Sequence, residues 1–235
     1  MSVALITGGS KGLGRALAAG LAERGWDLVL DARSDGPLRE AAGELRSRFG
    51  VRVTAVAGDV AKAGHRAELA AAARELGGLD LLVSNASALG AEPLVRLAEL
   101  PEEGLRRALE TNVVAALGLV RETLPSLRAS AAGSVVVVSS DAAVEPYANW
   151  GGYGASKAAL DQLAAVLGVE EPGLRVWSVD PGDLGTELYA AAVPEDLAPR
   201  PRPESVVPAF LELLDRRPAS GRWTAGALLS GAGER

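Results

Sequence analysis

Cysteine is absent from this chain of 235 residues, and histidine occurs once, as His65. The lack of cysteine excludes disulfides and metal sites built on thiolates. The single histidine excludes a histidine-rich metal site and a hydrolase triad that needs a second histidine. His65 lies in a polar segment, residues 63–67, that predicts the start of a helix. We therefore expect a solvated surface position for His65 rather than a catalytic one.

Long apolar runs are missing as well, since no run reaches the roughly 20 residues of a transmembrane helix. The first seven residues lack the basic region of a signal peptide and are typical of a strand. The net charge of −6 is not accompanied by a basic stripe, which argues against nucleic acid as a partner. We expect a cytoplasmic protein that binds neither membrane nor nucleic acid.

The residues that are present indicate a globular α/β protein. Hydrophobic residues make up 48% and charged residues 23% of the chain, which is ordinary for a globular domain. Short apolar runs alternate with longer segments rich in Ala, Leu, Arg and Glu. The apolar runs are residues 3–6, 28–30, 51–57, 80–84, 134–138, 174–179 and 226–230, and the helical patterns lie near 12–24, 36–49, 61–77, 101–130, 153–168 and 204–216. This alternation predicts βαβ units: a single doubly wound, Rossmann-type domain over residues 1–235, with about seven parallel strands and helices on both faces of the sheet.

A proline-rich segment from Pro194 to Pro203 interrupts this alternation. Proline removes a backbone donor and disfavours a helix there. A loop of this kind after the carboxyl end of a strand could cover a ligand crevice. It could equally be an irregular connection without a role. We assign a substrate-loop segment to about 183–203 and leave both interpretations open.

A glycine-rich turn, residues 7–14, follows the first predicted strand and opens the first predicted helix. Glycine permits a tight turn and a close approach of the backbone to a pyrophosphate. The helix N-terminus supplies unpaired N–H groups and the positive end of the helix dipole. The strand–turn–helix context therefore predicts a dinucleotide site.

Tyr153 and Lys157 are four residues apart in a helical pattern, so they share one helix face. A nearby ammonium favours phenolate and lowers the pKa of a tyrosine. A tyrosine tuned in this way can exchange a proton with an alcohol or a carbonyl oxygen. Taken alone, the pair is also common on exposed helix faces.

The spacing Gly-x-x-x-Gly-x-Gly, taken with Tyr153 and Lys157, resembles the short-chain dehydrogenase/reductase family in its compact form. The resemblance extends from Thr7 to about Thr186 and implies hydride transfer between a nicotinamide cofactor and a carbonyl or secondary alcohol. It implies that Tyr153 is the general acid/base and that Lys157 lowers the tyrosine pKa and binds the nicotinamide ribose. Ser140, thirteen residues before Tyr153, would position the substrate oxygen, with Ser139 as the weaker candidate by spacing.

Asn112 matches the asparagine that, in the family, bends a helix and holds a proton-relay water. In isolation Asn112 would be an ordinary exposed residue of a helix, and Ser140 a serine that caps the end of its strand. The resemblance therefore gives a catalytic set of Asn112, Ser140, Tyr153 and Lys157.

The end of the second predicted strand favours NADP(H) over NAD(H). In the family, the acidic residue of NAD-dependent members stands where Ala32 falls. Asp31 is one position earlier, on the opposite face of a strand, and Arg33 follows where NADP-dependent members often have a base. Lys11, in the glycine turn, is a second cation near the expected 2′-phosphate.

The resemblance also implies the other cofactor contacts. Asp59 and Val60 correspond to the adenine-binding pair, although Asp59 would also suit a helix cap. Asn85 and Ala86 match the family's Asn-Asn-Ala-Gly segment, from which Ser84 and Ser87 depart. The run from Pro181 to Thr186 corresponds to the segment that contacts the nicotinamide carboxamide. The full set is Gly8, Ser10, Lys11, Gly12, Leu13, Gly14, Arg33, Ser34, Asp59, Val60, Asn85, Ala86, Tyr153, Lys157, Pro181, Gly182, Leu184 and Thr186.

Substrate selection falls outside these motifs. Segments 87–93, 141–150 and 189–203 are candidate walls, and Tyr147 and Trp150 could face a substrate or pack at a subunit surface. Three functions remain open: a carbonyl reductase or alcohol dehydrogenase, a 3-oxoacyl-carrier-protein reductase, and a non-catalytic nucleotide-sensing or scaffold protein. The resemblance implies a homodimer or homotetramer joined through the helices of Asn112 and Tyr153. The bias toward Ala, Arg and Gly is typical of a high-GC bacterium.

Overall fold

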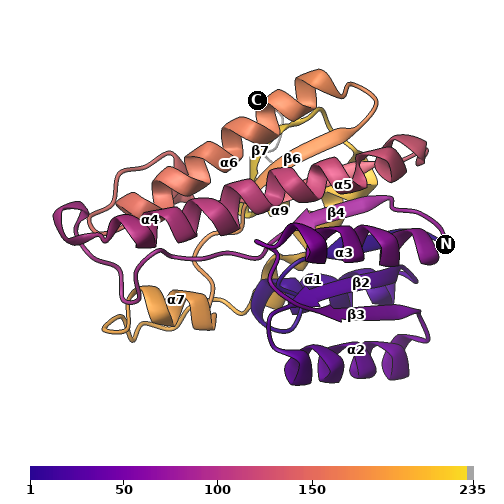
Figure 1. Ribbon diagram of the computed structural model, residues 1–235, viewed down its shortest axis with the longest axis horizontal. Coiled ribbons are helices and arrows are strands. Elements are labelled where there is room, and N and C mark those ends of the chain that lie inside the picture. The colour runs from indigo at the N-terminus through magenta and orange to yellow at the C-terminus, as the bar shows by residue number, and fades with distance from the viewer. Residues whose placement is uncertain (232–235) are drawn as a thin grey trace.

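The computed structural model describes residues 1–231, whose strands form a seven-stranded, all-parallel sheet (Figure 1). The strands are β1 Val3–Ile6, β2 Asp27–Ala32, β3 Val53–Ala57, β4 Leu81–Ser84, β5 Ser134–Val138, β6 Arg175–Asp180 and β7 Gly221–Thr224. Their order is β3-β2-β1-β4-β5-β6-β7. The chain proceeds outward from β1 in one direction and from β4 in the other, which confirms the predicted doubly wound fold.

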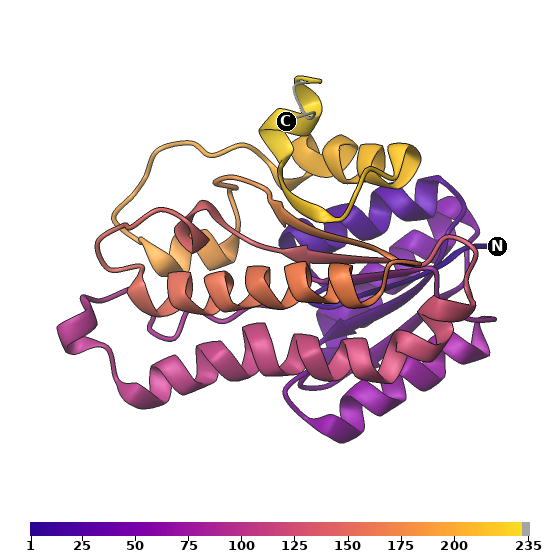
Figure 2. The same cartoon turned by 90° about the horizontal axis from the view of Figure 1, so that it is seen from above.

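Helices cover both faces of the sheet (Figure 2). They are α1 Gly12–Glu23, α2 Asp35–Phe49, α3 Ala63–Glu75, α4 Glu102–Leu109, α5 Ala115–Ala129, α6 Gly151–Glu170, α7 Glu187–Ala192, α8 Val207–Arg216 and α9 Ala225–Leu229. Apolar side chains of α1, α2 and α8 pack on one face, and those of α3, α5 and α6 pack on the other. Burial on both faces explains why the central strand β5 is apolar at four consecutive positions.

The strand order reverses between β1 and β4, and polar residues stand where the central strands end. Thr7 follows β1, Ser139 follows β5 and Asp180 ends β6. Parallel strands bring their carboxyl ends to one edge of the sheet, and ligands of such folds bind at that edge near the reversal. The architecture therefore brings the predicted cofactor turn and the predicted catalytic serine to the same edge.

The helical pattern predicted over 101–130 is confirmed, but it contains a wider turn. Residues 110–114 form a π-helical turn between α4 and α5, and Asn112 lies inside it. A π-turn inserts one extra residue into the helix, and such turns are frequent at functional sites.

Near the C-terminus, the strand predicted over 226–230 is wrong. The last strand, β7, lies earlier, and residues 225–229 form the helix α9. The Thr224 hydroxyl caps this helix by accepting a hydrogen bond from the Ala227 N–H at 3.1 Å. A short apolar run fits either a strand or a buried helix, and here the cap favours the helix.

The proline-rich segment 194–203 is irregular, as predicted. It is preceded by α7, a helix of six residues that the sequence did not indicate. Within residues 1–231, no helix is both long and apolar enough to cross a membrane.

Candidate active site

Tyr153 and Lys157 lie on one buried face of α6, as the spacing predicts. Their exposed fractions are 7% and 1%. The Lys157 ammonium donates a hydrogen bond to the backbone carbonyl of Val138 at 2.7 Å, and its Nζ lies 5.5 Å from the centroid of the Tyr153 ring. Because Val138 is the last residue of β5, this contact ties α6 to the strand that leads to Ser140.

Burial dominates the ionisation of both groups. It raises the pKa of the Tyr153 phenol, the Asp180 and Asp141 charges raise it further, and the hydroxyls of Ser87 and Ser140 oppose the rise. Burial lowers the pKa of Lys157 to about 8. In the chain by itself the loss of hydration outweighs the two hydroxyls, so the Tyr153 pKa lies above its ordinary value. A lowering of this pKa by Lys157 stays a prediction. Such a phenol stays protonated at neutral pH and can serve as a proton donor.

Ser140 stands at the end of β5 and faces Tyr153. Its hydroxyl donates to Asp141 Oδ1 at 2.9 Å and accepts from the Ala142 N–H at 3.2 Å, so it also caps the short turn that follows. The Trp150 ring packs edge-on against Tyr153, with 5.6 Å between the ring centroids. The structure thus brings Ser140 to the phenol of Tyr153, and Trp150 packs against the ring of the same tyrosine.

Asn112 is buried and joins three segments. Its Oδ1 accepts from the Ala88 N–H at 2.8 Å and from the Ser87 hydroxyl at 3.3 Å, and its Nδ2 donates to the Ser156 hydroxyl at 2.8 Å. The side chain therefore links the π-turn to the segment after β4 and to α6, one residue from Lys157.

Ser87 was expected only as part of the candidate substrate wall 87–93, and it lies at the candidate catalytic group. Its hydroxyl bonds to Asn112 and lies against the Tyr153 phenol. The departure from the family's glycine was visible in the sequence, but a serine at that position gains a chemical meaning only once its neighbours are known.

The glycine turn between β1 and α1 forms a cradle in which Gly8, Gly12 and Gly14 carry no side chain. Gly8 and Gly12 have φ of +67° and +56°, the left-handed region that favours glycine. A Cβ at Gly14 would lie 2.3 Å from the Gly8 carbonyl oxygen and 2.6 Å from Asn85 Nδ2. Asn85 in turn donates to the Thr7 carbonyl at 2.8 Å. The cradle fits a pyrophosphate, since backbone N–H groups can approach it closely. Ser10 and Leu13 are buried within it.

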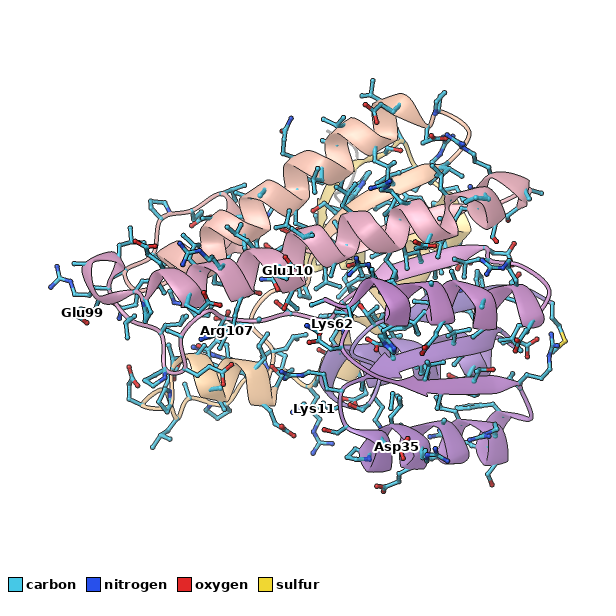
Figure 3. The ribbon with its side chains drawn as sticks, viewed as in Figure 1. Lys11, Asp35, Lys62, Glu99, Arg107 and Glu110 are labelled. Carbon is cyan, nitrogen blue, oxygen red and sulfur yellow. The ribbon has the colours of Figure 1, made fainter. Side chains whose placement is uncertain are left out.

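The predicted nicotinamide segment faces this cradle. Gly182 has φ of +74°, and Leu184 is buried as an anchor in the core. Thr186 caps α7, and its methyl group lies 3.5 Å from where a Cβ at Gly12 would stand. Lys11 in the turn forms an ion pair with Glu187 of α7. Figure 3 shows Lys11 between α7 and the start of α2.

At the predicted adenosine end, the expected solvated surface position of His65 is wrong, because the side chain is buried. His65 is 7% exposed, and its Nε2 lies 2.6 Å from Oδ1 of Asp31, which is 2% exposed. Gly58 makes room for the ring, because a Cβ there would lie 2.3 Å from His65 Nδ1. Asp31 points toward α3, on the sheet face opposite to that of Ala32, as the strand register predicted.

The remaining predicted contacts line the same end. Arg33 and Ser34 are exposed just after β2, and within residues 1–231 Arg33 forms no ion pair. Asp59 is exposed and accepts from the Ala61 N–H at 2.9 Å, which makes a turn before α3 rather than a cap on the helix itself. Val60 is buried.

Comparison with known proteins agrees with this geometry. The sequence profile described as short chain dehydrogenase matches residues 2–196. The chain belongs to the short-chain dehydrogenase family. Over 214 residues, this short-chain dehydrogenase is 38% identical to sepiapterin reductase of Rattus norvegicus, an alignment that covers 86% of the chain and 81% of the relative. It is 35% identical to dehydrogenase/reductase SDR family member 4 of Bos taurus, and that alignment covers 88% of this chain and 73% of the relative.

Solved structures of the family share its fold. An alcohol dehydrogenase from the archaeon Thermococcus sibiricus, complexed with 5-hydroxy-NADP, superposes with a TM-score of 0.86 at 29% identity and covers 95% of each chain. A short chain dehydrogenase of Escherichia coli CFT073, complexed with NADPH, superposes with a TM-score of 0.88 at 29% identity, with 95% of this chain and 96% of that chain covered. This short-chain dehydrogenase is therefore an oxidoreductase of that family, and its candidate site stands in the fold that these structures share.

Proposed function

We propose that this protein is an NADP(H)-dependent oxidoreductase that interconverts a carbonyl compound and a secondary alcohol, with Tyr153 as general acid/base. The observation that carries the proposal is the buried phenol of Tyr153, which stands beside Lys157 and faces the hydroxyl of Ser140. This group lies at the same sheet edge as the glycine cradle. The relatives described above are named as reductases or dehydrogenases.

The residues have separate tasks in this proposal. The bound nicotinamide supplies the hydride for reduction. The Ser140 hydroxyl turns its proton from Asp141 to the substrate oxygen and fixes that oxygen by a hydrogen bond. Tyr153 gives the same oxygen its proton. The Lys157 ammonium has three N–H donors, and the bond to Val138 uses one. The other two are available to hold the nicotinamide ribose.

Charge around the adenosine end supports NADP(H). The guanidinium of Arg33 is exposed next to Ser34 at the end of β2, where a 2′-phosphate could form a charge-assisted bidentate contact. Asp31, two residues before Arg33, is held by His65 on the other face of the sheet. Both solved relatives described above are complexed with an NADP form.

The proposal includes the surroundings of the site. The segment 183–203 covers the substrate, and the protein forms a homo-oligomer through α5 and α6. The segment has internal polar bonds that would hold such a cover in shape: Arg200 Nη2 donates to the Tyr189 hydroxyl at 2.7 Å, and that hydroxyl donates to Asp196 at 2.7 Å.

Tyr153→Phe tests the proposed function, with Tyr147→Phe as a matched control. Tyr147 is an exposed tyrosine that bonds to Asp141 and Glu145. We expect a panel of ketones and aldehydes to reveal NADPH oxidation by the wild type. Tyr153→Phe should lose at least about a hundredfold in kcat, because it removes the general acid, and should still bind NADPH. Tyr147→Phe should keep turnover within about twofold.

Turnover by Tyr153→Phe at the wild-type rate would contradict the role of Tyr153. A wild type that binds NADPH but reduces no carbonyl and oxidises no alcohol would favour the nucleotide-sensing alternative.

A further inference from the structure

Arg222 lies behind the candidate site and belongs to none of its sequence motifs. It is in β7, at the register position opposite Ser178 of β6. Its Nη2 donates to the Ser140 carbonyl oxygen at 3.0 Å. The same guanidinium places Nε 3.1 Å from Asp161 Oδ2 and Nη2 3.4 Å from Asp180 Oδ2. One side chain therefore contacts the segment after β5, the end of β6 and the helix α6.

Each acceptor of Arg222 is next to a residue of the candidate site. The first is the backbone of Ser140 itself. Asp161 is one helical turn after Lys157 on α6. Asp180 directly precedes the nicotinamide segment, and its Oδ1 accepts from the Gly182 N–H at 2.9 Å. The Ser178 hydroxyl also donates to Asp161, which fixes that carboxylate from the sheet.

The charges around Lys157 and Tyr153 come from four elements. Asp161 of α6 opposes the effect of burial on the Lys157 pKa. Asp180 of β6 and Asp141, after β5, add to the effect of burial on the Tyr153 pKa. Arg222 of β7 is the cation that faces two of these carboxylates.

Solvent screens this network only in part. The side chains of Asp161 and Asp180 are 15% and 9% exposed, and that of Arg222 is 29% exposed. Charge pairs at this depth interact more strongly than surface pairs.

We propose that Arg222 is a positioning residue of the candidate site, which holds the Ser140 carbonyl in place and balances the Asp161 and Asp180 carboxylates, and thereby sets the pH range in which Tyr153 and Lys157 act. The part of this inference that concerns turnover rests on the proposed function. The electrostatic part can be measured on Lys157 without a substrate.

The direct test is the titration of lysine side chains by NMR after labelling with [6-¹³C]lysine. The chain has three lysines, Lys11, Lys62 and Lys157, and Lys157→Met assigns the buried one. In Arg222→Met, Asp161 and Asp180 lose their cation, so the pKa of Lys157 should rise by about 0.5 or more. In Asp161→Asn the carboxylate is gone, and the same pKa should fall.

Two further variants separate charge from general stability. Arg128→Met removes another arginine–carboxylate pair, with Glu171, at the far ends of α5 and α6, and should leave the Lys157 pKa unchanged. Arg222→Lys keeps the positive charge but cannot contact all three acceptors. It should keep the Lys157 pKa near the wild-type value and lower kcat, because the Ser140 backbone loses its donor.

Turnover gives the second readout. Arg222→Met should lower kcat about tenfold or more, as expected when reacting groups are misplaced, with the Kd for NADPH within about twofold of the wild type. Its pH–rate profile should shift upward together with the Lys157 pKa, whereas that of Asp161→Asn should shift downward.

Equal Lys157 pKa values in the wild type, Arg222→Met and Asp161→Asn would overturn the proposal. If Arg222→Met does not fold, Arg222→Gln takes its place, because it removes the same charge and keeps an amide donor. The proposal expects a higher Lys157 pKa in Arg222→Gln, whereas a purely structural arginine predicts no movement of that pKa. A wild type without nicotinamide-linked turnover would contradict the proposed function instead, and the lysine titration would still decide the role of Arg222.

Discussion

The Lys157 side chain is 1% exposed, and its ammonium lies against the backbone of β5. Burial lowers its pKa from the ordinary 10.5 to about 8. A difference of this size corresponds to about 3 kcal/mol against the charged form in the folded state. Asp161 reduces this cost without removing it. The lysine that is proposed to hold the cofactor ribose therefore lowers the free energy of unfolding.

The cost of burying charged Lys157 predicts a pH-dependent effect of Lys157→Met on stability. The folded pKa lies below the unfolded one, so between about pH 8 and pH 10.5 the unfolded chain binds more protons and the stability of the wild type rises with pH. Below pH 8 the full cost is present. The free energy of unfolding of Lys157→Met minus that of the wild type should therefore be about 2–3 kcal/mol higher at pH 7 than at pH 10. Both free energies are measured by unfolding in urea.

The absolute difference at pH 7 also includes the loss of the bond to Val138, so the change with pH is the diagnostic quantity. Lys62→Met, at an exposed position before α3, is the control and should show no such trend. A constant difference between Lys157→Met and the wild type from pH 7 to pH 10 would show that burial does not perturb this lysine.

Arg33 carries the prediction on cofactor choice. Arg33→Ala should weaken NADPH binding about tenfold or more, because it removes a charge-assisted contact with the 2′-phosphate, and should leave NADH binding within about twofold. Arg39→Ala, which removes an exposed arginine paired with Asp35 on α2, serves as the control. Nucleotide fluorescence gives the Kd values, and tighter binding of NADH than of NADPH by the wild type would reject the assignment.

Among the elements, the π-turn between α4 and α5 shows how one side chain positions several segments. Asn112 bonds to the loop after β4 and to Ser156 on α6. The carbonyl oxygen and the nitrogen of its side-chain amide both form these bonds, so the wider turn is held by tertiary contacts rather than by local preference. The same contacts bring Ser87 to Tyr153.

Elements with a strong pattern could be predicted from the sequence, whereas short ones could not. The uninterrupted valines of β5 and the regular alternation of strands and helices indicated the parallel sheet. The six-residue helix α7 is too short to show a helical period. The run that forms α9 has no period either, and its conformation depends on the cap at Thr224.

The same distinction applies to the candidate site. Tyr153 and Lys157 share one helix, so their spacing alone placed them on one face. The contacts of His65 with Asp31 and of Arg222 with Ser140 join residues 34 and 82 positions apart. No local pattern encodes such pairs, because they depend on which strands become neighbours. The room for His65 depends further on the absence of a side chain at Gly58.

At the scale of the whole molecule, the run from α4 to α5 and the helix α6 lie side by side along one face (Figures 1 and 2). Their inner sides cover the sheet and contribute to the core. Their outer sides expose apolar residues: Val114 at 46%, Leu117 at 45%, Val166 at 41% and Val169 at 82%. Exposed apolar side chains on both of these neighbouring helical segments fit the proposed homo-oligomer.

Leu117→Glu tests this assembly. A charge placed in an apolar interface between two copies is costly to bury, so the variant should change from oligomer to monomer at micromolar concentration in sedimentation velocity. Leu197→Glu is the control, since Leu197 is an exposed leucine, at 89%, in the proline-rich segment away from α5 and α6; it should stay oligomeric. Because Tyr153 and Lys157 face inward, Leu117→Glu should still bind NADPH. A wild type that sediments as a monomer at every concentration would contradict the assembly, and an oligomeric Leu117→Glu would place its interface on another face.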